Sequence, residues 1–276
     1  MSRLISVVAI LTLASCMPDA QDSPIRGYAE IDDFKMYYEI HGAGDTILML
    51  HGGTGHGEGA WPELRPLLAP DYRLIIVDSR SQGRSTHSSK SLSYDLMTKD
   101  VVALMDHLEI ERAHVIGASD GGIIGLNLAM KHPDRLDKVV AYGTNFHFDG
   151  LAQENVDGIL QMTPETYGEE SAKANYLDVS PNPEKFADLL EDIGRLWLSS
   201  PTWTVEELGK IETPMFIIDD TLGKSIRIEH TETMADAIPG ARLAFIDDTD
   251  HRAYLDHPEE FARLAVVFFE DKIAEL

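Results

Sequence analysis

The sequence predicts an α/β domain built on a mostly parallel sheet with helices on both faces, and three observations predict it. Short apolar runs alternate with segments of helical spacing along most of the chain. A serine lies on a glycine-flanked turn, Gly117-Ala118-Ser119-Asp120-Gly121, between a β-branched run and a helical one. The alternation breaks between residues 148 and 212 and then resumes.

The first half of the chain predicts strands separated by helices. Apolar runs typical of strands occupy 27–31, 34–40, 46–50, 73–77, 113–116 and 138–142. Asp32-Asp33 joins the first two runs as a hairpin. Helical spacing occupies 61–68, 95–108 and 122–130. This order of strands and helices is typical of a parallel sheet covered on both faces.

The second half predicts an insertion followed by the last strands. Residues 148–212 contain helical stretches, among them 185–198, and no convincing strand. A strand at 214–218, a helix at 229–238, a strand at 242–246 and a helix from Pro258 follow. We interpret 26–147 and 213–276 as one core and 148–212 as a helical lid over the carboxyl ends of the strands. A peripheral insertion with no role in substrate binding is the alternative.

Composition limits the function classes. With 276 residues, of which 43% are apolar, the chain can bury a substantial core. Its formal net charge of -24 repels phosphate backbones, which argues against a nucleic-acid-binding protein. The acidity serves solubility first, and it favours neutral or cationic substrates over anionic ones. No His, Asp, Glu and Cys grouping has convincing metal-ligand spacing.

The N-terminus predicts a targeting segment. Arg3 precedes an apolar run at 4–13 that is too short to cross a bilayer and suits a signal peptide, which we place at 1–15. Leu13-Ala14-Ser15-Cys16 resembles a bacterial lipobox, which implies a lipid anchor on Cys16, a tether over 16–25 and a place in the cell envelope, on the periplasmic or extracellular side. The alternative is a plain secretory signal whose cysteine is incidental. Because Cys16 is the only cysteine, the chain has no internal disulfide.

From Tyr28 to its end the chain resembles the α/β-hydrolase family. Four matches occur in the family's order, each after a predicted strand: His51-Gly52-Gly53, Asp78-Ser79-Arg80-Ser81-Gln82-Gly83-Arg84-Ser85, Ser119 and Asp250-His251. Ser81 replaces the first glycine that the family has in the second of them. The resemblance implies that Ser119 is the nucleophile of the turn, that His51-Gly52-Gly53 is the oxyanion loop and that His251 is the catalytic histidine. It implies no organic cofactor and no metal.

The chemistry requires these residue types. A serine hydroxyl is a weak nucleophile at neutral pH and needs a base within hydrogen-bond reach. Histidine suits this role because its pKa lies near the operating pH, and His251 is the candidate. Negative charge develops on the substrate's carbonyl oxygen, and the backbone N–H groups of Gly53 and Asp120 are placed to receive it.

The third member of the triad does not match. The position where the family carries its aspartate is Gly223, in the segment Asp219-Asp220-Thr221-Leu222-Gly223. Three readings stay open: the acid has shifted to Asp220 or to Asp219, Ser119 and His251 act as a dyad, or the chain only binds a ligand. Asn145 occupies an alternative acid location in the family, but an amide can only orient the histidine ring.

The sequence as a whole therefore predicts a lipid-anchored serine hydrolase. Its substrate is expected to be a small carboxylic ester or lactone, cleaved through an acyl-enzyme intermediate. The alternative is a non-catalytic or weakly active pseudo-hydrolase, because Gly223 stands at the usual acid position. The fold alone does not determine the substrate.

Overall fold

The computed structural model describes residues 23–272. The predicted signal peptide and the predicted lipidation site Cys16 lie outside the described residues. Within them, no helix combines the length and the apolarity that a bilayer span requires.

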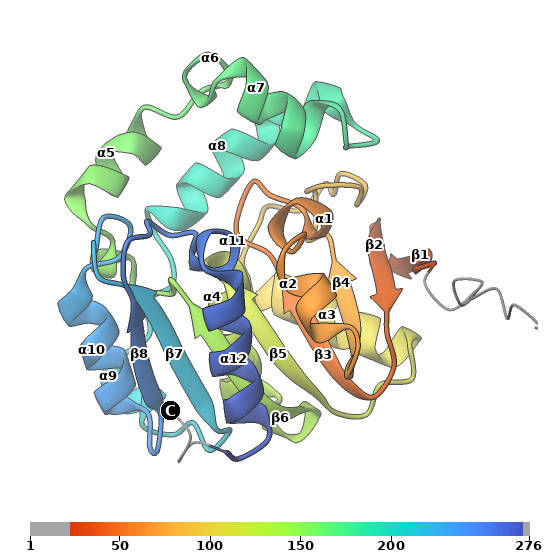
Figure 1. Cartoon of the computed structure of the whole chain (residues 1–276). Helices are drawn as coiled ribbons and strands as arrows, with labels where there is room; N and C mark the ends of the chain where they lie inside the picture. The colour runs from red at the N-terminus through yellow and green to blue at the C-terminus, as the bar shows by residue number, and fades with distance from the viewer. Residues whose placement is uncertain (1–22, 273–276) are drawn as a thin grey trace, which may run out of the picture.

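A single eight-stranded sheet forms the centre of the described chain (Figure 1). Its strands are β1 (Ile25–Ile31), β2 (Phe34–His41), β3 (Asp45–Leu50), β4 (Tyr72–Val77), β5 (Ala113–Ala118), β6 (Leu136–Tyr142), β7 (Met215–Asp220) and β8 (Arg242–Ile246). The spatial order is β1-β2-β4-β3-β5-β6-β7-β8. The first two strands pair antiparallel and β2 runs antiparallel to β4, while all the other pairs are parallel. The predicted, mostly parallel α/β sheet is confirmed.

Helices cover both faces of the sheet. The α-helices are α1 (Gly57–Ala60), α2 (Leu64–Leu68), α3 (Tyr94–His107), α4 (Asp120–Lys131), α5 (Gln153–Leu160), α6 (Pro164–Tyr167), α7 (Glu169–Ala172), α8 (Phe186–Trp197), α9 (Val205–Leu208), α10 (Ile228–Ala237), α11 (Ala253–Asp256) and α12 (Pro258–Phe269). Short 3-10 or π turns lie at Pro133–Arg135, Phe148–Gly150, Lys173–Leu177 and Pro183–Lys185. The predicted helix at 61–68 is wrong at its start. Two short helices flank Trp61, because Pro62 cannot donate a helical hydrogen bond.

Alternating strand residues feed two apolar cores. Leu48 and Leu50 of β3 pack with α3, α4 and α10 on one face, while Ile47 and Met49 pack with α2 and α12 on the other. The period of two follows from the pleat of a strand, and burial on both faces explains why the central strands are continuously apolar.

The helical insertion lies at one end of the sheet. Residues 148–212 connect β6 to β7 and carry α5 to α9, of which α5 to α8 gather at the top of Figure 1. Two isolated bridges, His147 with Thr202 and Leu151 with Ile226, tie its ends to the core. Several of its side chains reach the carboxyl ends of β3, β5 and β8, where the site described below lies.

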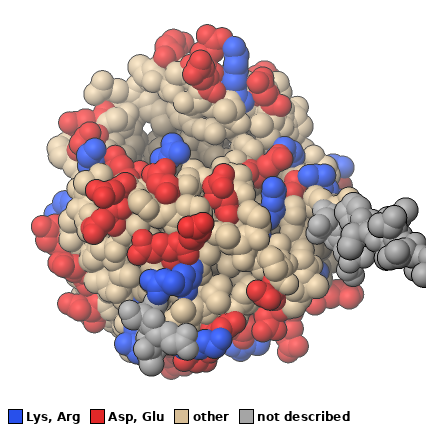
Figure 2. Space-filling model, in the orientation of Figure 1, with Lys and Arg blue, Asp and Glu red and all other residues tan. Residues whose placement is uncertain are grey.

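The surface carries an excess of acidic side chains. In Figure 2 the Asp and Glu residues outnumber Lys and Arg on the face in view, in keeping with the net charge of -24. The same view shows a hollow between the helices at its top and the body below.

Candidate active site

Segments far apart in the sequence line one cavity of about 200 Å³ at the carboxyl ends of the strands. Its polar wall comes from the ends of the core strands and includes Gly53, Ser119, Asp120, Asn145 and His251. Its apolar wall comes from both the insertion and the core: Leu151, Ile159, Trp197, Ile226 and Tyr254. The structure thus brings together the predicted nucleophile, the predicted base and both predicted oxyanion residues.

Ser119 lies on a sharp turn between β5 and α4. Its φ of 53° and ψ of -118° form a backbone conformation that residues other than glycine rarely adopt. Such strain concentrates at functional sites. Glycines make the turn possible: a Cβ on Gly121 would lie 2.0 Å from the carbonyl oxygen of Leu50, and one on Gly117 would lie 2.3 Å from that of Gly121. Ser119 is thereby the N-cap residue of a 12-residue helix, without a capping hydrogen bond from its side chain. The helix dipole favours negative charge at this position.

The predicted oxyanion loop follows β3 and passes directly over this turn. A Cβ on Gly52 would lie 3.1 Å from the Cβ of Ser119, so the loop backbone approaches the serine closely. His51 holds the loop, because its Nδ1 donates to the Gly52 carbonyl (2.6 Å) while its Nε2 accepts from the Ser79 N–H (2.9 Å). Burial lowers the pKa of His51, in keeping with this neutral tautomer.

His251 follows β8 with a φ of 56°, a second left-handed residue at the cavity. Burial lowers the pKa of its imidazole, and the negative charges of Asp220 and, to a smaller extent, Asp250 act in the opposite direction. A Cβ on Gly143 would lie 2.7 Å from Nδ1, so the ring rests on the backbone that follows β6. Nδ1 is buried and has no hydrogen-bond partner in the described part of the chain.

The two candidate acids point to different partners. Both lie within β7, which extends two residues beyond the predicted strand. Asp220 accepts the backbone N–H of His251 on Oδ2 (2.9 Å) and those of Leu222 and Gly223 on Oδ1 (3.0 Å each). Asp219 accepts from the Thr231 hydroxyl (2.6 Å) and from the N–H of Asp220 (2.9 Å). Burial raises the pKa of Asp219 to about 7. Asp220 is therefore the carboxylate beside His251, although it contacts the histidine's backbone and not its ring.

The side chain of Asp120 adds contacts that the sequence did not predict. Its Oδ1 accepts from the Tyr94 hydroxyl of α3 (2.9 Å) and from Nε1 of Trp197 in α8 (2.8 Å). Its Oδ2 is buried and has no partner among the described residues. Burial raises the pKa of Asp120 to about 6, against the effect of the two hydrogen bonds. The residue after the serine therefore ties the nucleophile turn to the insertion.

The remaining polar candidates have structural partners. The Asn145 amide lines the cavity and donates to the His147 carbonyl (3.0 Å). Asp78 accepts the backbone N–H groups of Gly57 and Arg84 (2.7 Å each), which makes it an anchor for two loops. Between residues 23 and 272, no three or more His, Cys, Asp and Glu side chains are grouped in a way that could hold a metal ion.

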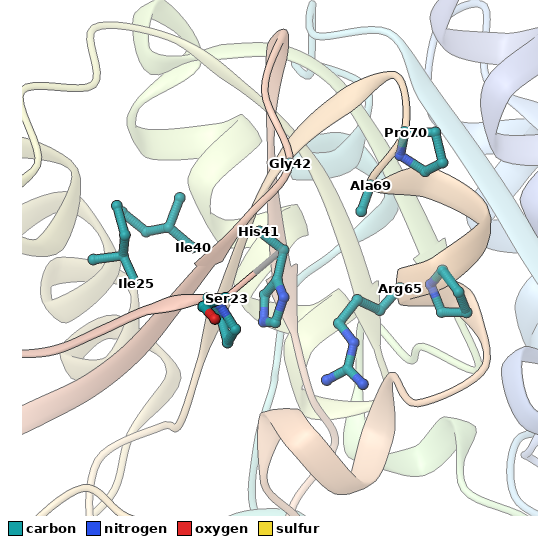
Figure 3. Close-up of a pocket in the computed structure, with 10 residues that line it drawn as sticks. Ser23, Ile25, Ile40, His41, Gly42, Arg65, Ala69 and Pro70 are labelled. Atoms are coloured by element: carbon teal, nitrogen blue, oxygen red, sulfur yellow. The ribbon is translucent and has the colours of Figure 1, made fainter. Parts of the chain in front are cut away.

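A larger cleft, of about 590 Å³, lies elsewhere on the molecule and lacks this chemistry. Figure 3 shows His41 of β2 and Arg65 of α2 among its lining residues. His41 bonds to Glu39 (2.8 Å), and neither Ser119 nor His251 lines the cleft. The smaller cavity is therefore the candidate active site.

The chain belongs to the α/β-hydrolase fold family, because the family model matches residues 45–182, half of the chain. It is 28% identical over 271 residues to the 2-hydroxy-6-oxo-6-phenylhexa-2,4-dienoate hydrolase of Comamonas testosteroni, covering 88% of this chain and 94% of that one. It is 25% identical over 250 residues to the serine hydrolase BPHL of Homo sapiens, covering 87% and 84%.

The fold is also similar to that of a hydrolase from Pseudomonas aeruginosa PA01, known from its crystal structure. The two share a TM-score of 0.69 and 25% sequence identity over 88% of this chain and 97% of that one. All three proteins are named as hydrolases, and hydrolase activity is therefore the function class that the comparisons support.

Proposed function

We propose that this protein is a serine hydrolase that cleaves a small carboxylic ester or lactone through an acyl-enzyme intermediate. The observation that carries the proposal is the single cavity lined by Ser119, His251, Gly53 and Asp120. Two of these residues, Ser119 and His251, hold left-handed backbone conformations that cost energy and are retained at sites of function.

Ser119 is the proposed nucleophile and His251 its base. His251 takes the hydroxyl proton as Oγ attacks the carbonyl carbon, and it returns that proton to the leaving alcohol when the C–O bond breaks. Water, deprotonated by the same histidine, then attacks the acyl-serine, and His251 returns the proton to Oγ of Ser119 as the acid is released. Burial favours the neutral imidazole that both steps require, because it lowers the pKa of His251.

The backbone N–H groups of Gly53 and Asp120 are the proposed oxyanion donors. The first lies in the loop that follows β3 and the second begins α4, and the loop backbone passes close to Ser119. Donors held in place before the reaction stabilise the developing charge without reorganisation, and losing one typically costs about 3 kcal/mol of barrier.

Asp220 is the proposed acid of the triad, with Asp219 as the alternative. The negative charge of Asp220 raises the pKa of His251, against the effect of burial. Asp219 is not among the groups that shift this pKa. Three backbone N–H groups hold this carboxylate in place without using the histidine ring. We infer that Asp220 stabilises the imidazolium that forms after proton transfer by its charge.

A ligand-binding pseudo-hydrolase is the second candidate, and one observation favours it. Nδ1 of His251 is buried and has no hydrogen-bond partner in the described chain, so no carboxylate fixes the ring's tautomer. The same geometry is compatible with a dyad of Ser119 and His251.

The test is turnover of p-nitrophenyl acetate and butyrate and of γ-butyrolactone. We expect hydrolysis by the wild type and a loss of about 10⁴-fold or more in kcat for Ser119→Ala, because the nucleophile is removed. Ser171→Ala, which changes an exposed serine of the insertion, is the matched control and keeps the wild-type rate. Wild-type protein that hydrolyses none of the three compounds would favour the pseudo-hydrolase.

We also propose that residues 148–212 act as a lid and that Cys16 carries a lipid anchor. The insertion contributes Leu151, Ile159 and Trp197 to the cavity wall, which supports the first proposal. The lipobox-like Leu13-Ala14-Ser15-Cys16 supports the second. An anchored protein needs detergent for extraction from bacterial membranes, and Cys16→Ser is expected to abolish that requirement.

A further inference from the structure

The predicted oxyanion loop continues into a residue with a strained backbone. Thr54, which follows Gly53, has a φ of 60° and is buried. A β-branched residue rarely adopts this left-handed conformation, which persists only where surrounding contacts hold it in place. The two residues before it, Gly52 and Gly53, are glycines and have the greatest backbone freedom of any residue type. Contacts outside these three residues therefore decide where the loop lies.

Contacts within the core hold the first part of the loop. The carbonyl of Gly52 accepts from Nδ1 of His51 (2.6 Å) and from the N–H of Gly55 (3.3 Å). The carbonyl of Gly53 accepts instead from the hydroxyl of Thr54 (2.7 Å). The orientation of the Gly53 backbone, whose N–H is a proposed oxyanion donor, is therefore tied to the side chain of Thr54.

The insertion in turn holds the side chain of Thr54. The hydroxyl of Tyr167, the last residue of α6, donates to Oγ1 of Thr54 (2.9 Å). Nδ2 of Asn175 donates to the same Tyr167 oxygen (3.1 Å), and the Tyr167 ring packs edge-on against Phe186, with 5.3 Å between the ring centroids. A chain of three hydrogen bonds thus leads from the insertion to the carbonyl of Gly53.

The insertion also packs directly against the loop. A Cβ on Gly53 would lie 2.4 Å from Cζ2 of Trp197 and 2.8 Å from Cδ1 of Ile193, both in α8. Only glycine fits between α8 and the core at this point. Nε1 of Trp197 donates to Asp120 (2.8 Å), which carries the other proposed oxyanion donor. The insertion therefore contacts both residues that supply these donors.

We propose that Tyr167 is a positioning residue for the reaction: through Thr54 it holds the Gly53 N–H in the orientation that receives the oxyanion. The inference rests on the proposed function and gives the insertion a role beyond covering the cavity. Tyr167 is not among the residues that line the cavity, so it acts through the loop and not by contact with the substrate. The oxyanion forms only during the reaction, so losing Tyr167 slows the reaction without weakening substrate binding.

The test is Tyr167→Phe, which removes the hydroxyl and keeps the ring against Phe186. For p-nitrophenyl butyrate we expect kcat to fall about five- to tenfold and KM to stay within about twofold. Acylation and deacylation both pass through an oxyanion, so a loss common to both steps leaves KM unchanged.

Tyr176→Phe is the matched control. The Tyr176 hydroxyl also bonds within the insertion, to the carbonyl of Asn182 (3.2 Å), and its ring also packs on Phe186. The variant therefore removes the same chemical group from the same part of the insertion, without touching the loop, and it is expected to keep the wild-type kcat.

Variants of Thr54 test whether the effect passes through this residue. Thr54→Val keeps the shape of the side chain without the hydroxyl, and it is expected to lower kcat at least as much as Tyr167→Phe. Adding Tyr167→Phe to Thr54→Val is expected to cause no further loss, because the hydrogen bond is already absent. Thr54→Ser retains the hydroxyl and is expected to keep most of the rate. Independent, multiplying losses in the double variant would overturn the proposed chain.

A trifluoromethyl ketone measures the oxyanion contact separately from turnover. 1,1,1-Trifluoropentan-2-one has the acyl chain of the butyrate and forms a tetrahedral oxyanion with a serine nucleophile. Its inhibition constant is expected to rise in Tyr167→Phe by the factor by which kcat/KM falls, and to stay at the wild-type value in Tyr176→Phe. An unchanged inhibition constant in Tyr167→Phe would overturn the proposal.

The failures of the two proposals are distinguishable. Equal rates in Tyr167→Phe and Tyr176→Phe, or a rise in KM with unchanged kcat, would overturn the positioning role and leave the hydrolase intact. If the wild type cleaves no ester, the proposed hydrolysis fails. Hydrogen exchange at the N–H of Gly55, which bonds to Gly52, then decides whether Tyr167 holds the loop. Exchange must be faster in Tyr167→Phe than in wild type and Tyr176→Phe, and equal exchange would overturn the inference.

Discussion

Two aspartates at the same end of the sheet differ in how their oxygens are used. Asp220, at the end of β7, receives three backbone N–H groups that occupy both of its oxygens. Asp120, after β5, receives two side-chain donors on one oxygen and none on the other. Backbone donors hold both oxygens of Asp220 in place, whereas the second oxygen of Asp120 is enclosed without a donor from the described residues. The contrast assigns Asp220 to the charge beside His251, and Asp120 to the link between the nucleophile turn and the insertion.

Among the changes to these aspartates, replacing Asp220 is expected to have the largest effect on activity. We expect Asp220→Asn to lower kcat about 10²- to 10³-fold for p-nitrophenyl acetate, because an amide carries no charge to stabilise protonated His251. Because Asp220 also raises the pKa of His251, the acid limb of the rate profile is expected to move to lower pH in the variant.

Asp219→Asn is the matched control for that experiment. It is expected to retain the rate within about threefold, because Asp219 bonds to Thr231 and to the N–H of Asp220 and has no contact with His251. Equal, near-wild-type rates in both variants would show that neither aspartate is the acid of a triad. The dyad of Ser119 and His251 would then remain as the mechanism.

The same Asp219→Asn variant is also expected to change the pH dependence of the free energy of unfolding. The folded pKa of Asp219, about 7, lies above the usual aspartate value of 3.8, so between these pH values the folded state holds a proton that the unfolded state has lost. The free energy of unfolding therefore falls as the pH rises from about 4 to 7. Asparagine avoids that loss and can bond to the same two partners.

We expect the Asn variant to be more stable than the wild type by roughly 2 kcal/mol at pH 8 and by much less at pH 4.5. Urea denaturation at both pH values measures the difference. A stability difference that does not change with pH would contradict the buried, proton-binding state of Asp219.

The sequence predicts the sheet and the nucleophile turn well because both depend on local patterns. Runs of β-branched residues define the central strands, and the glycines around Ser119 are required by contacts closer than a Cβ allows. The ends of elements are less predictable: β7 continues through Asp219 and Asp220, since buried aspartates bonded to backbone and hydroxyl groups can remain in a strand.

The contacts of the site could not be predicted because they join residues far apart in the chain. Trp197 and Tyr94 reach Asp120 across 77 and 26 positions, and no local pattern marks either of them. The contact between the Gly143 backbone and the ring of His251 is equally hard to predict, because it forms only when the strands are assembled. One sequence signal could have pointed to these contacts: the residue directly after Ser119 is acidic. The structure buries it, and a buried carboxylate needs hydrogen-bond partners.

Labelling with a fluorophosphonate probe tests the central claim, that Ser119 is an activated nucleophile, most directly. Peptide mapping by mass spectrometry is expected to find one adduct per chain, on Ser119, absent in Ser119→Ala and retained in Ser171→Ala. His251→Gln is expected to slow the labelling strongly, because the base is removed. A wild-type protein that stays unlabelled, or an adduct that persists in Ser119→Ala, would contradict the claim.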